Sequence, residues 1–392
     1  MSQPTVILEE KRAKILNRYR HPWVFSKGLQ QKPPFEAGTQ VRVTSQKGRQ
    51  LGWAFYHPTN SICLRMISFE AEPMTPRDWS DRIDQAKQLR RAVLPADCHS
   101  YRLIHGENDG FPGLAVDVYG DVLSLQISSA GMERLRETLL PPLLAATGAT
   151  AVYERSVGHA RHREGLPSRQ GFLLGEKSFP FTIEEAGLRY EIDPAGDQKT
   201  GFYLDQRPQR RWLRQYAASK RILDLFSYSG GFTLPALMGG AAFVRSLDSS
   251  AHALEMLQRN LTLNGLSGDR QENLKTDVFE YLRGQGDERW DMVILDPPAL
   301  AKAVKTRDRA LKAYLQLNRD AARWVKPGGL LVSFSCTGVV SREQFKQSVF
   351  LGLREAGREA RVSHQFGAGP DHPLNPRFPE GEYLKGFALY LS

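Results

Sequence analysis

Acidic, glycine-rich and thiol-bearing positions recur in the C-terminal half of the chain, each directly after a run of apolar residues. Asp224 opens the stretch Asp-Leu-Phe-Ser-Tyr-Ser-Gly-Gly, which ends at Gly230 and Gly231. Two adjacent glycines let a backbone approach a ligand closely, because neither carries a Cβ. The stretch differs from the dinucleotide pattern GxGxxG, and GxxxxGK(S/T) occurs nowhere in the chain. A phosphate-binding P-loop is therefore excluded, and a nicotinamide site is disfavoured.

Two further aspartates end the next two apolar segments. Asp248 lies eighteen residues after Gly230 and is placed to accept hydrogen bonds from both hydroxyls of a ribose, while Asp277 could accept one from an adenine amino group. Any one of these aspartates could equally be a helix cap. Because the carboxyl ends of parallel strands share one edge of a sheet, Asp224, Asp248 and Asp277 together favour a nucleoside cofactor.

Two later strand ends carry residues suited to catalysis. Asp296 is followed by two prolines, which fix the exit of the chain and hold the carboxyl group in place. Cys336 follows another apolar run, and its position across from Asp296 at the cofactor site makes it the candidate nucleophile. The other cysteines, Cys63 and Cys98, are expected to be structural. Three distant cysteines form neither a disulfide framework nor a four-ligand zinc site, and no metal site is predicted.

Alternating strands and helices must position these residues from about residue 196 onward. Near-continuous apolar strands separated by helices predict an α/β fold with a parallel, doubly wound sheet. Helices are expected after Gly231 and over 251–265 and 307–324. The expected strands cover 221–226, 243–248, a weaker segment before Asp277, 290–296, 329–336, 360–366 and 386–392.

The N-terminal part predicts a small β-barrel in residues 1–73. Its strands are expected over 41–45, 50–56 and 61–69. The preceding basic segment runs up to Trp23 and Phe25, which are expected to cap the barrel core. That arrangement leaves Arg18 and Arg20 facing outward, where basic groups beside aromatic rings can hold RNA.

A middle α+β domain is predicted over 74–192, before a third domain over 193–392. Its helices are expected over 78–94, with Leu89 or Leu94 on the buried face, and near 132–144. The segment from His159 to His162 has metal-like spacing, but it lacks a third ligand nearby and is expected to be a surface loop.

Composition and charge agree with a protein that binds a polyanion. The 392 residues include 53 Lys and Arg against 43 Asp and Glu, a formal charge of +10. Residues 1–70 carry +7, residues 71–195 carry −4 and residues 196–392 carry +7, which fits RNA held between two basic ends. A basic solvated surface explains the charge equally well. No apolar run approaches a membrane span and no signal peptide is apparent, so a cytoplasmic protein without a membrane partner is expected.

Four segments together resemble a known family: DLFSYSGGF, LDPPALAK, SFSCTG and DQKTGFYLDQR. They are similar to the bacterial large-subunit (23S) ribosomal RNA cytosine-5 methyltransferases, which use S-adenosylmethionine. The likeness covers the whole chain, since RHPWVFS resembles the start of the family's N-terminal PUA domain. It implies a PUA-like barrel, a middle α+β domain and a Rossmann-like class I methyltransferase domain, with ribosomal RNA as partner.

The resemblance also implies roles for individual residues. The cofactor would be lined by 224–231, with Asp248 on the ribose and Asp277 on the adenine, and the segment Lys199–Arg207 would pack over its methionine end. Cys336 would be the nucleophile. The implied cofactor-binding side chains include Phe226, Tyr228, Tyr203, Asp205 and Arg207.

The reaction explains why these residue types are needed. Carbon 5 of cytosine is a poor nucleophile, and adding the Cys336 thiolate at carbon 6 makes it enamine-like. Asp296, in its protonated form or by sharing a proton, would hydrogen-bond ring nitrogen 3 and stabilise the charge that develops there. The sequence does not identify the base that removes the hydrogen from carbon 5. Ala299 stands where many RNA cytosine-5 methyltransferases place a second cysteine and where amino-group methyltransferases place an aromatic. This leaves product release unexplained and argues against methylation of adenine N6.

Basic residues after the two prolines could grip the RNA that flanks a flipped nucleotide. An exposed basic helix face is the alternative explanation for them. These residues are Lys302, Lys305, Arg307, Arg309 and Lys312.

Three other functions stay open on sequence grounds. A Rossmann-type dehydrogenase would need a tighter glycine fingerprint. A non-catalytic RNA-binding protein would use the barrel and keep the Rossmann-like half as a scaffold. A methyltransferase could also act on another RNA. The modified nucleotide, the choice between free RNA and an assembled subunit, and the formation of a homodimer are likewise left open.

Overall fold

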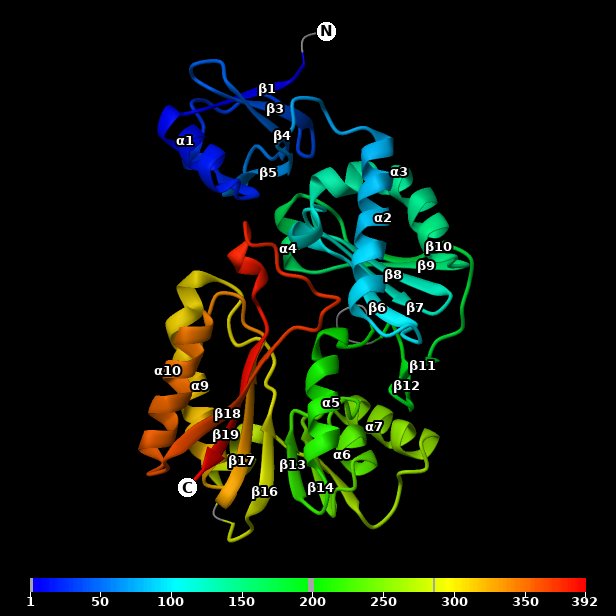
Figure 1. Cartoon of the computed structure of the whole chain (residues 1–392), viewed down its shortest axis with the longest axis vertical. Helices are drawn as coiled ribbons and strands as arrows, with labels where there is room; N and C mark the ends of the chain where they lie inside the picture. Colours follow the sequence, from blue (N-terminus) through cyan, green and yellow to red (C-terminus); the bar gives the residue numbers. More distant parts are fainter. Residues whose placement is uncertain (1–2, 197–200, 285) are drawn as a thin grey trace. The chain divides into compact units, whose positions relative to one another are not determined.

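The computed structural model describes residues 3–196, 201–284 and 286–392, which divide into two compact units (Figure 1). The first unit holds the chain up to Phe181 together with Ile192–Phe202 and Pro370–Gly381. The second holds Thr182–Glu191, Tyr203–Gly369 and Glu382–Ser392. The division into three domains at residues 73 and 192 stays a prediction.

The first unit begins with a small β-sheet in the order β1-β3-β4-β5-β2. The predicted central strands are present, and two short strands and a helix join them. Gly52, with φ of 133°, lets β4 approach β5, because a Cβ there would lie 2.2 Å from the carbonyl oxygen of Ser68. The elements are β1 (Thr5–Leu8), α1 (Glu10–Tyr19), β2 (Trp23–Phe25), η1 (Ser26–Gly28), β3 (Gln40–Ser45), β4 (Gln50–Tyr56) and β5 (Ile62–Ser68).

The expectation that Trp23 and Phe25 cap the core of this sheet is wrong. The side chain of Phe25 is 53% exposed, because alternate residues of the short strand β2 face opposite sides and Val24 takes the buried position. Trp23 is half-buried, donates its Nε1–H to Glu107 at 2.8 Å, and packs edge-on against Phe378. Its partners thus come from distant parts of the chain within the first unit.

The second sheet of this unit has the order β10-β9-β8-β7-β6. Helix α2 starts at a capping box of Thr75 and Asp78, and buries Trp79, Ile83 and Ala86. Of the two alternatives for the next buried position, Leu89 is exposed and Leu94 is half-buried, and Arg90 is buried instead. The elements are α2 (Pro76–Val93), β6 (Ser100–His105), η2 (Gly106–Asp109), β7 (Leu114–Tyr119), β8 (Val122–Ile127), α3 (Ala130–Thr147), β9 (Ala151–Ser156), α4 (His159–Arg163), β10 (Arg169–Leu174) and, in the C-terminal segment of this unit, η5 (Pro379–Gly381).

The segment His159–Arg163 is a short helix, α4, and not the surface loop that its polar sequence indicated. Arg161 is fully buried and its guanidinium pairs with Glu133 at 2.8 Å. Carbonyl oxygens and the Glu133 carboxylate accept hydrogen bonds from its Nε and Nη1 groups and offset part of the cost of burial, while its Nη2 group has no hydrogen-bond partner among the described residues. Its neighbour His162 contacts Ser168 at 2.9 Å.

The second unit contains a sheet in the order β15-β14-β13-β16-β17-β19-β18. The five neighbouring strands β15, β14, β13, β16 and β17 are parallel, as predicted. Strand β19 lies between β17 and β18 and runs antiparallel to both. Among the described residues between β18 and β19, the short 3-10 helix η5 is the sole helical element, and antiparallel neighbours need no helical crossover. The elements are β11 (Phe181–Glu185), β12 (Leu188–Ile192), η3 (Leu204–Gln206), α5 (Arg207–Tyr216), β13 (Arg221–Leu225), α6 (Thr233–Met238), β14 (Phe243–Asp248), α7 (Ala251–Leu263), β15 (Gln271–Lys275), α8 (Val278–Arg283), β16 (Trp290–Leu295), η4 (Val304–Thr306), α9 (Arg307–Ala322), β17 (Val325–Ser335), α10 (Arg342–Glu355), β18 (Ala360–Gly367) and β19 (Lys385–Leu391).

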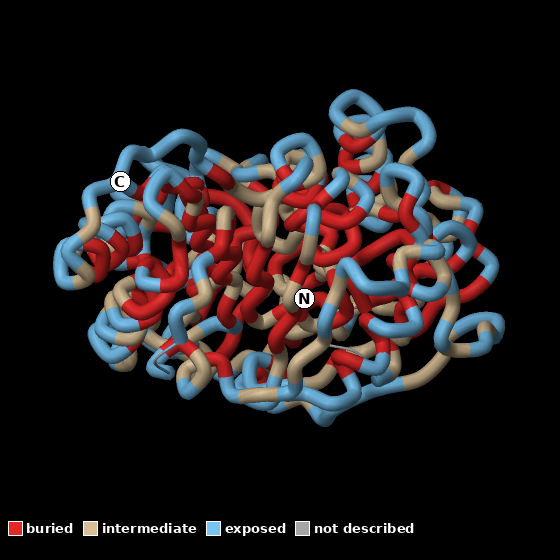
Figure 2. The backbone as a smooth tube through the Cα atoms, turned by 90° about the horizontal axis from the view of Figure 1, so that it is seen from below, coloured by how far each residue is buried: buried red, intermediate tan, exposed pale blue. Residues whose placement is uncertain are grey.

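Alternating residues of the parallel strands face two hydrophobic layers. Leu223 and Leu225 of β13 join a core cluster with α8, α9 and α10, to which Tyr314 and Phe345 contribute. Helices α9 and α10 pack side by side (Figure 1). Helices α6 and α7 contact β14. In Figure 2 the buried residues gather in the interior and the exposed ones in the outer turns and loops. The strand ends therefore project the site residues from a rigid support.

Candidate active site

The turn after β13 has an unusual backbone. Phe226 and Tyr228 have positive φ values of 63° and 49°, which side chains other than glycine rarely adopt. Such strain persists where the surroundings hold it, and it concentrates at ligand sites. Here the Tyr228 N–H donates to Asp248 Oδ2 at 3.0 Å, and the Ser227 N–H donates to the Leu247 carbonyl oxygen at 3.0 Å. The turn is thereby fastened to the end of β14.

The two glycines of this turn serve different purposes. Gly230 has φ of 89°, and a Cβ on it would lie 2.2 Å from Leu257 Cδ1 and 2.6 Å from Leu234 Cδ1. It is required by packing. A Cβ on Gly231 would meet no described atom within 4 Å. The space beside Gly231 is therefore where a ligand could approach the backbone.

Asp224 is a fully buried carboxyl group inside β13. Its Oδ2 accepts a hydrogen bond from Thr233 Oγ1 at 2.7 Å, while Oδ1 is buried and has no hydrogen-bond partner among the described residues. Burial raises the pKa of Asp224 to about 7, against the lowering effect of the Thr233 hydrogen bond, and the Asp296 carboxylate raises it further. An unpaired acceptor beside a strained glycine turn fits a ligand that brings a donor.

Asp248 and Asp277 lie at the ends of neighbouring strands, as predicted. Asp248 is the last residue of β14, and its two oxygens accept the N–H groups of Tyr228 and Ser250. Asp277 is exposed and caps α8 by accepting the Glu280 N–H at 3.0 Å. Asp277 is thus a helix cap, whereas Asp248 fastens the turns that follow β13 and β14. A carboxylate oxygen has a second lone pair for a ligand, and the contacts to ribose and adenine stay predictions.

Asp296, which directly follows β16, accepts a hydrogen bond from the segment that precedes α5. Gln206 in η3 donates its Nε2–H to Asp296 Oδ2 at 3.0 Å. The ring of Tyr203 lies edge-on to that of Tyr228, with centroids 5.8 Å apart. Burial raises the pKa of Tyr203, and the charges of Asp296, Tyr228 and Cys336 raise it further. These side chains therefore lie within electrostatic reach of one another.

Cys336 directly follows β17 and is half-buried. Its Sγ lies 3.9 Å from the carbonyl oxygen of Pro297, so the thiol and the Asp-Pro-Pro turn meet at one edge of the sheet. The next residue, Thr337, binds the turn from the other side, with its Oγ1 accepting the Leu300 N–H at 3.1 Å and contacting the Tyr314 hydroxyl at 2.7 Å. The predicted juxtaposition of Cys336 and Asp296 is thus present.

The other cysteines have different surroundings. Cys63 is buried in β5, and burial raises the pKa of its thiol to about 12. Cys98 is half-buried in a connection and contacts the Ser100 carbonyl oxygen at 3.4 Å. A thiol with a raised pKa is unreactive at neutral pH, as expected for a structural Cys63.

Part of the predicted methionine-end segment lies outside the described residues, including Lys199. Asp205 is buried, and its Oδ2 accepts the hydroxyl hydrogen of Tyr383 at 2.6 Å. Arg207 and Arg210 are buried beside Glu185, with their Nε atoms 3.0 and 2.6 Å from its carboxylate. These contacts anchor α5, and the predicted cofactor contacts of Tyr203, Asp205 and Arg207 stay predictions.

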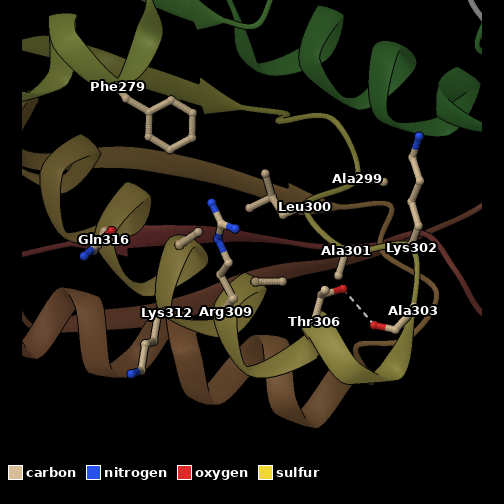
Figure 3. Close-up of a pocket in the computed structure, with 12 residues that line it drawn as sticks. Phe279, Ala299, Leu300, Ala301, Lys302, Ala303, Thr306, Arg309, Lys312 and Gln316 are labelled. Atoms are coloured by element: carbon tan, nitrogen blue, oxygen red, sulfur yellow. Dashed lines mark hydrogen bonds between the residues drawn. The ribbon is translucent and has the colours of Figure 1, made fainter.

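A cavity of about 840 Å³ opens beside the Asp-Pro-Pro turn. Its size suits a nucleoside-sized group. In Figure 3 the Phe279 ring and the Arg309 guanidinium face this space from α8 and α9. Neither Asp296 nor Cys336 lines it. Its lining is Phe279, Ala299, Leu300, Ala301, Lys302, Ala303, Thr306, Arg309, Ala310, Lys312, Ala313 and Gln316.

The residues predicted to hold RNA occupy separate surfaces. Lys302 lines the cavity, Lys305 is exposed on η4, and Arg307 begins α9 beside Asp308. Arg18 and Arg20 are exposed at the end of α1, with guanidinium groups 5.3 Å from the Tyr19 ring centre and 5.6 Å from that of Phe69. Their outward direction agrees with the sequence interpretation, and their contact with RNA stays a prediction.

The described residues contain no group of three or more His, Cys, Asp or Glu side chains that could hold a metal ion. Within the same residues, no helix is both long and apolar enough to cross a membrane.

Sequence reasoning missed Gln206, Lys385 and Tyr383. Gln206 and Tyr383 lie in polar segments, where no periodic pattern distinguishes them. Lys385 did leave a signal, since it is a lysine at the start of an apolar strand and is fully buried. Buried lysines are rare unless they have a partner or a task.

Comparisons with known proteins agree with this arrangement. A family model described as S-adenosylmethionine-dependent methyltransferase matches residues 102–387, and a PUA-like domain model matches residues 6–69. The chain therefore belongs to the S-adenosylmethionine-dependent methyltransferase family. S-adenosylmethionine is the cofactor of this family, as predicted, and the match argues against a dehydrogenase.

Full-length relatives make the similarity more specific. Ribosomal RNA large subunit methyltransferase I of Vibrio cholerae serotype O1 is 40% identical over 394 residues, which covers 98% of each chain. The protein of the same name from Photobacterium profundum is 39% identical over 397 residues and covers 99% of each.

Two solved structures share the fold. They are SMU.776 in complex with SAH, with a TM-score of 0.86, and a SAM-dependent methyltransferase from Streptococcus mutans, with a TM-score of 0.85. Each is 22% identical and covers 99% of this chain and 100% of that chain. The predicted fold class is confirmed: an α/β class I methyltransferase fold with an N-terminal PUA-like domain.

Proposed function

We propose that this chain methylates carbon 5 of a cytosine in large-subunit ribosomal RNA through a covalent adduct with Cys336. The observation that carries the proposal is the meeting of the Cys336 thiol with the Asp-Pro-Pro turn at the carboxyl edge of the sheet. The names of the relatives support ribosomal RNA as the substrate class. A cytoplasmic location follows from that substrate, and homodimer formation stays an open prediction.

The residues around the β13 turn fit S-adenosylmethionine. The open space at Gly231 and the unpaired Oδ1 of Asp224 suit a ligand with hydrogen-bond donors. Phe226 and Tyr228 belong to this turn, Asp248 is hydrogen-bonded to it, and Asp277 follows β15, two strands along the sheet; these residues would hold the nucleoside. When bound, the cofactor supplies a methyl group from a sulfonium.

The protein residues would carry out the remaining chemistry. The Cys336 thiolate adds to carbon 6 of cytosine, so a sulfur–carbon bond forms and the electron pair moves toward carbon 5 and ring nitrogen 3. Asp296, oriented by Gln206 and in its protonated form or sharing a proton, hydrogen-bonds nitrogen 3 and stabilises the negative charge there. After methylation of carbon 5, a base takes its hydrogen as a proton, and the sulfur–carbon bond breaks to restore the thiolate.

The RNA would reach this site as a flipped or unpaired nucleotide. Lys302, Lys305 and Arg307 follow the Asp-Pro-Pro turn and would hold its flanking phosphates. Arg18 and Arg20 would bind RNA at the PUA-like domain. Two alternative functions predict different results in the experiment below. One is a methyltransferase that acts on another RNA, and the other is an RNA-binding protein whose Rossmann-like unit is a scaffold.

Replacing Cys336 by serine tests the proposal. We expect Cys336→Ser to lose at least a thousandfold in methyl transfer while keeping cofactor affinity, because a hydroxyl at neutral pH is a far weaker nucleophile than a thiolate. The measurement is 5-methylcytosine mapped in ribosomal RNA from cells with and without each variant, together with cofactor titration of the purified protein. The matched control is Cys98→Ser, in a half-buried connection.

Undiminished 5-methylcytosine in the Cys336→Ser strain would sink the covalent mechanism. A mark that depends on the protein but maps to another RNA would support the first alternative. Cofactor binding without any mark that depends on the protein would support the scaffold.

A further inference from the structure

Lys385 is a buried cation beside the candidate nucleophile. It is the first residue of β19, and in the antiparallel pairing with β17 it lies directly opposite Ser335, the residue before Cys336. Its side chain is fully buried. An ammonium group removed from water is costly unless acceptors replace its hydration shell. The position of Lys385 therefore needs an explanation that packing alone does not provide.

The acceptors of Lys385 are carbonyl oxygens of the segment that follows the nucleophile. Its Nζ donates to the Thr337 carbonyl oxygen at 2.9 Å and to that of Val340. The ammonium thus ties together the start and the end of the turn after Cys336. No carboxylate among the described residues forms an ion pair with it, so its charge is only partly compensated.

Electrostatic coupling joins this ammonium to the thiol. Burial lowers the pKa of Lys385 to about 8, while Glu382 and then Cys336 raise it and Arg342 lowers it. A pairwise charge interaction is mutual, so a thiolate that favours the ammonium is itself favoured by the ammonium. Tyr203 and Tyr314 also lie within electrostatic reach of Cys336, and both would be negative if ionised.

We propose that Lys385 is the positioning residue of Cys336, which holds the Thr337–Val340 turn through two carbonyl oxygens and stabilises the thiolate with its ammonium group. The consequence for catalysis rests on the proposed function. The consequence for the thiol does not, because it follows from charge and geometry alone. A thiolate is needed for addition to cytosine. The buried ammonium group of Lys385 would therefore favour the reactive form of Cys336.

The experiment measures the thiol directly in the full-length protein. Alkylation of Cys336 by iodoacetamide is followed from pH 6 to pH 10 by peptide mass spectrometry in the wild type and in Lys385→Met, Lys385→Gln and Lys385→Arg. Methionine removes the charge and the donors, glutamine keeps N–H donors without charge, and arginine keeps both. Alkylation of Cys98 in the same samples is the internal control, and circular dichroism checks folding.

We expect the methionine and glutamine variants to alkylate Cys336 about tenfold more slowly at pH 7, with the profile moved about one unit higher, which corresponds to the loss of one close cation. The arginine variant should stay near the wild type. The rate at Cys98 should not change. If the methionine variant does not fold, the comparison of the glutamine and arginine variants tests whether the charge of Lys385 stabilises the Cys336 thiolate.

An unchanged Cys336 profile in the folded glutamine variant would overturn the electrostatic part, and an unchanged profile in the methionine variant would overturn the inference as a whole. A moved profile together with undiminished 5-methylcytosine in the Cys336→Ser strain would leave Lys385 as the positioning residue of the thiol and reject the covalent mechanism.

Discussion

A single buried carboxyl group, Asp224, illustrates how much of a site is decided atom by atom. The sequence places an aspartate at a strand end, but burial and two neighbouring carboxylates determine its charge. A pKa of about 7 means that the carboxyl group titrates near neutral pH in the folded chain. A carboxyl group in an unfolded chain titrates at about pH 3.9.

The contribution of Asp224 to the stability of the cofactor-free protein should therefore fall as pH rises from about 4 to about 7. In that window the folded state binds a proton that the unfolded state has lost, so each step upward favours unfolding until both are ionised. Asparagine at this position cannot ionise. We therefore expect the free energy of unfolding of Asp224→Asn, relative to that of the wild type, to increase by about 1 to 4 kcal/mol between pH 5 and pH 8. Urea unfolding of both proteins at pH 5 and pH 8 measures this difference. An equal change in the free energy of unfolding of the wild type and of Asp224→Asn would contradict the prediction.

The turn after β13 shows how an element converts backbone shape into a binding surface. Strained residues and a required glycine lie beside a glycine that nothing in the described structure requires. The strained residues and Gly230 maintain the shape of the turn. Gly231 leaves room for a ligand.

Alanine at the two glycines should separate these roles. Gly230→Ala should lower the free energy of unfolding by about 2–4 kcal/mol, since its Cβ would clash with Leu257 and Leu234 in a left-handed backbone. Gly231→Ala should change it by less than about 0.5 kcal/mol but weaken S-adenosylmethionine binding at least tenfold. Denaturant unfolding and calorimetric titration test the pair. Unweakened cofactor binding by folded Gly231→Ala would place the ligand elsewhere.

At the scale of the whole molecule, the charge of the chain divides into basic ends and a less basic middle, with +7 in residues 1–70. Helix α1 carries part of this charge on exposed side chains. Binding of RNA by such a surface releases counterions, so affinity should depend steeply on salt.

Removing one phosphate contact should reduce that dependence. We expect the slope of log affinity against log salt for ribosomal RNA fragments to be steep, and Arg18→Gln to make it shallower by about 0.7 to 0.9. Arg77→Gln is the control, because Arg77 is exposed on α2 and was not assigned to RNA. Filter binding at several salt concentrations gives both slopes. A flat plot for the wild type, or equal changes in the two variants, would count against the assignment.

Much of the fold and part of the site follow from local sequence. The apolar runs at 221–226 and 290–296 are strands because near-continuous apolar segments suit a sheet covered on both faces. Parallel neighbours then bring their carboxyl ends to one edge, which places Asp224, Asp296 and Cys336 near one another. These inferences need only periodicity and the geometry of parallel strands.

The tertiary structure decided what depends on contacts between distant residues. Gln206 reaches Asp296 across 90 residues, and Tyr383 reaches Asp205 across 178. The insertion of β19 between β17 and β18 brings Lys385 opposite Ser335. Local propensity carries no information on which distant segments pair. The sequence alone therefore determined the strand ends and the class of chemistry, whereas packing decided which buried groups face the thiol and what charge they carry.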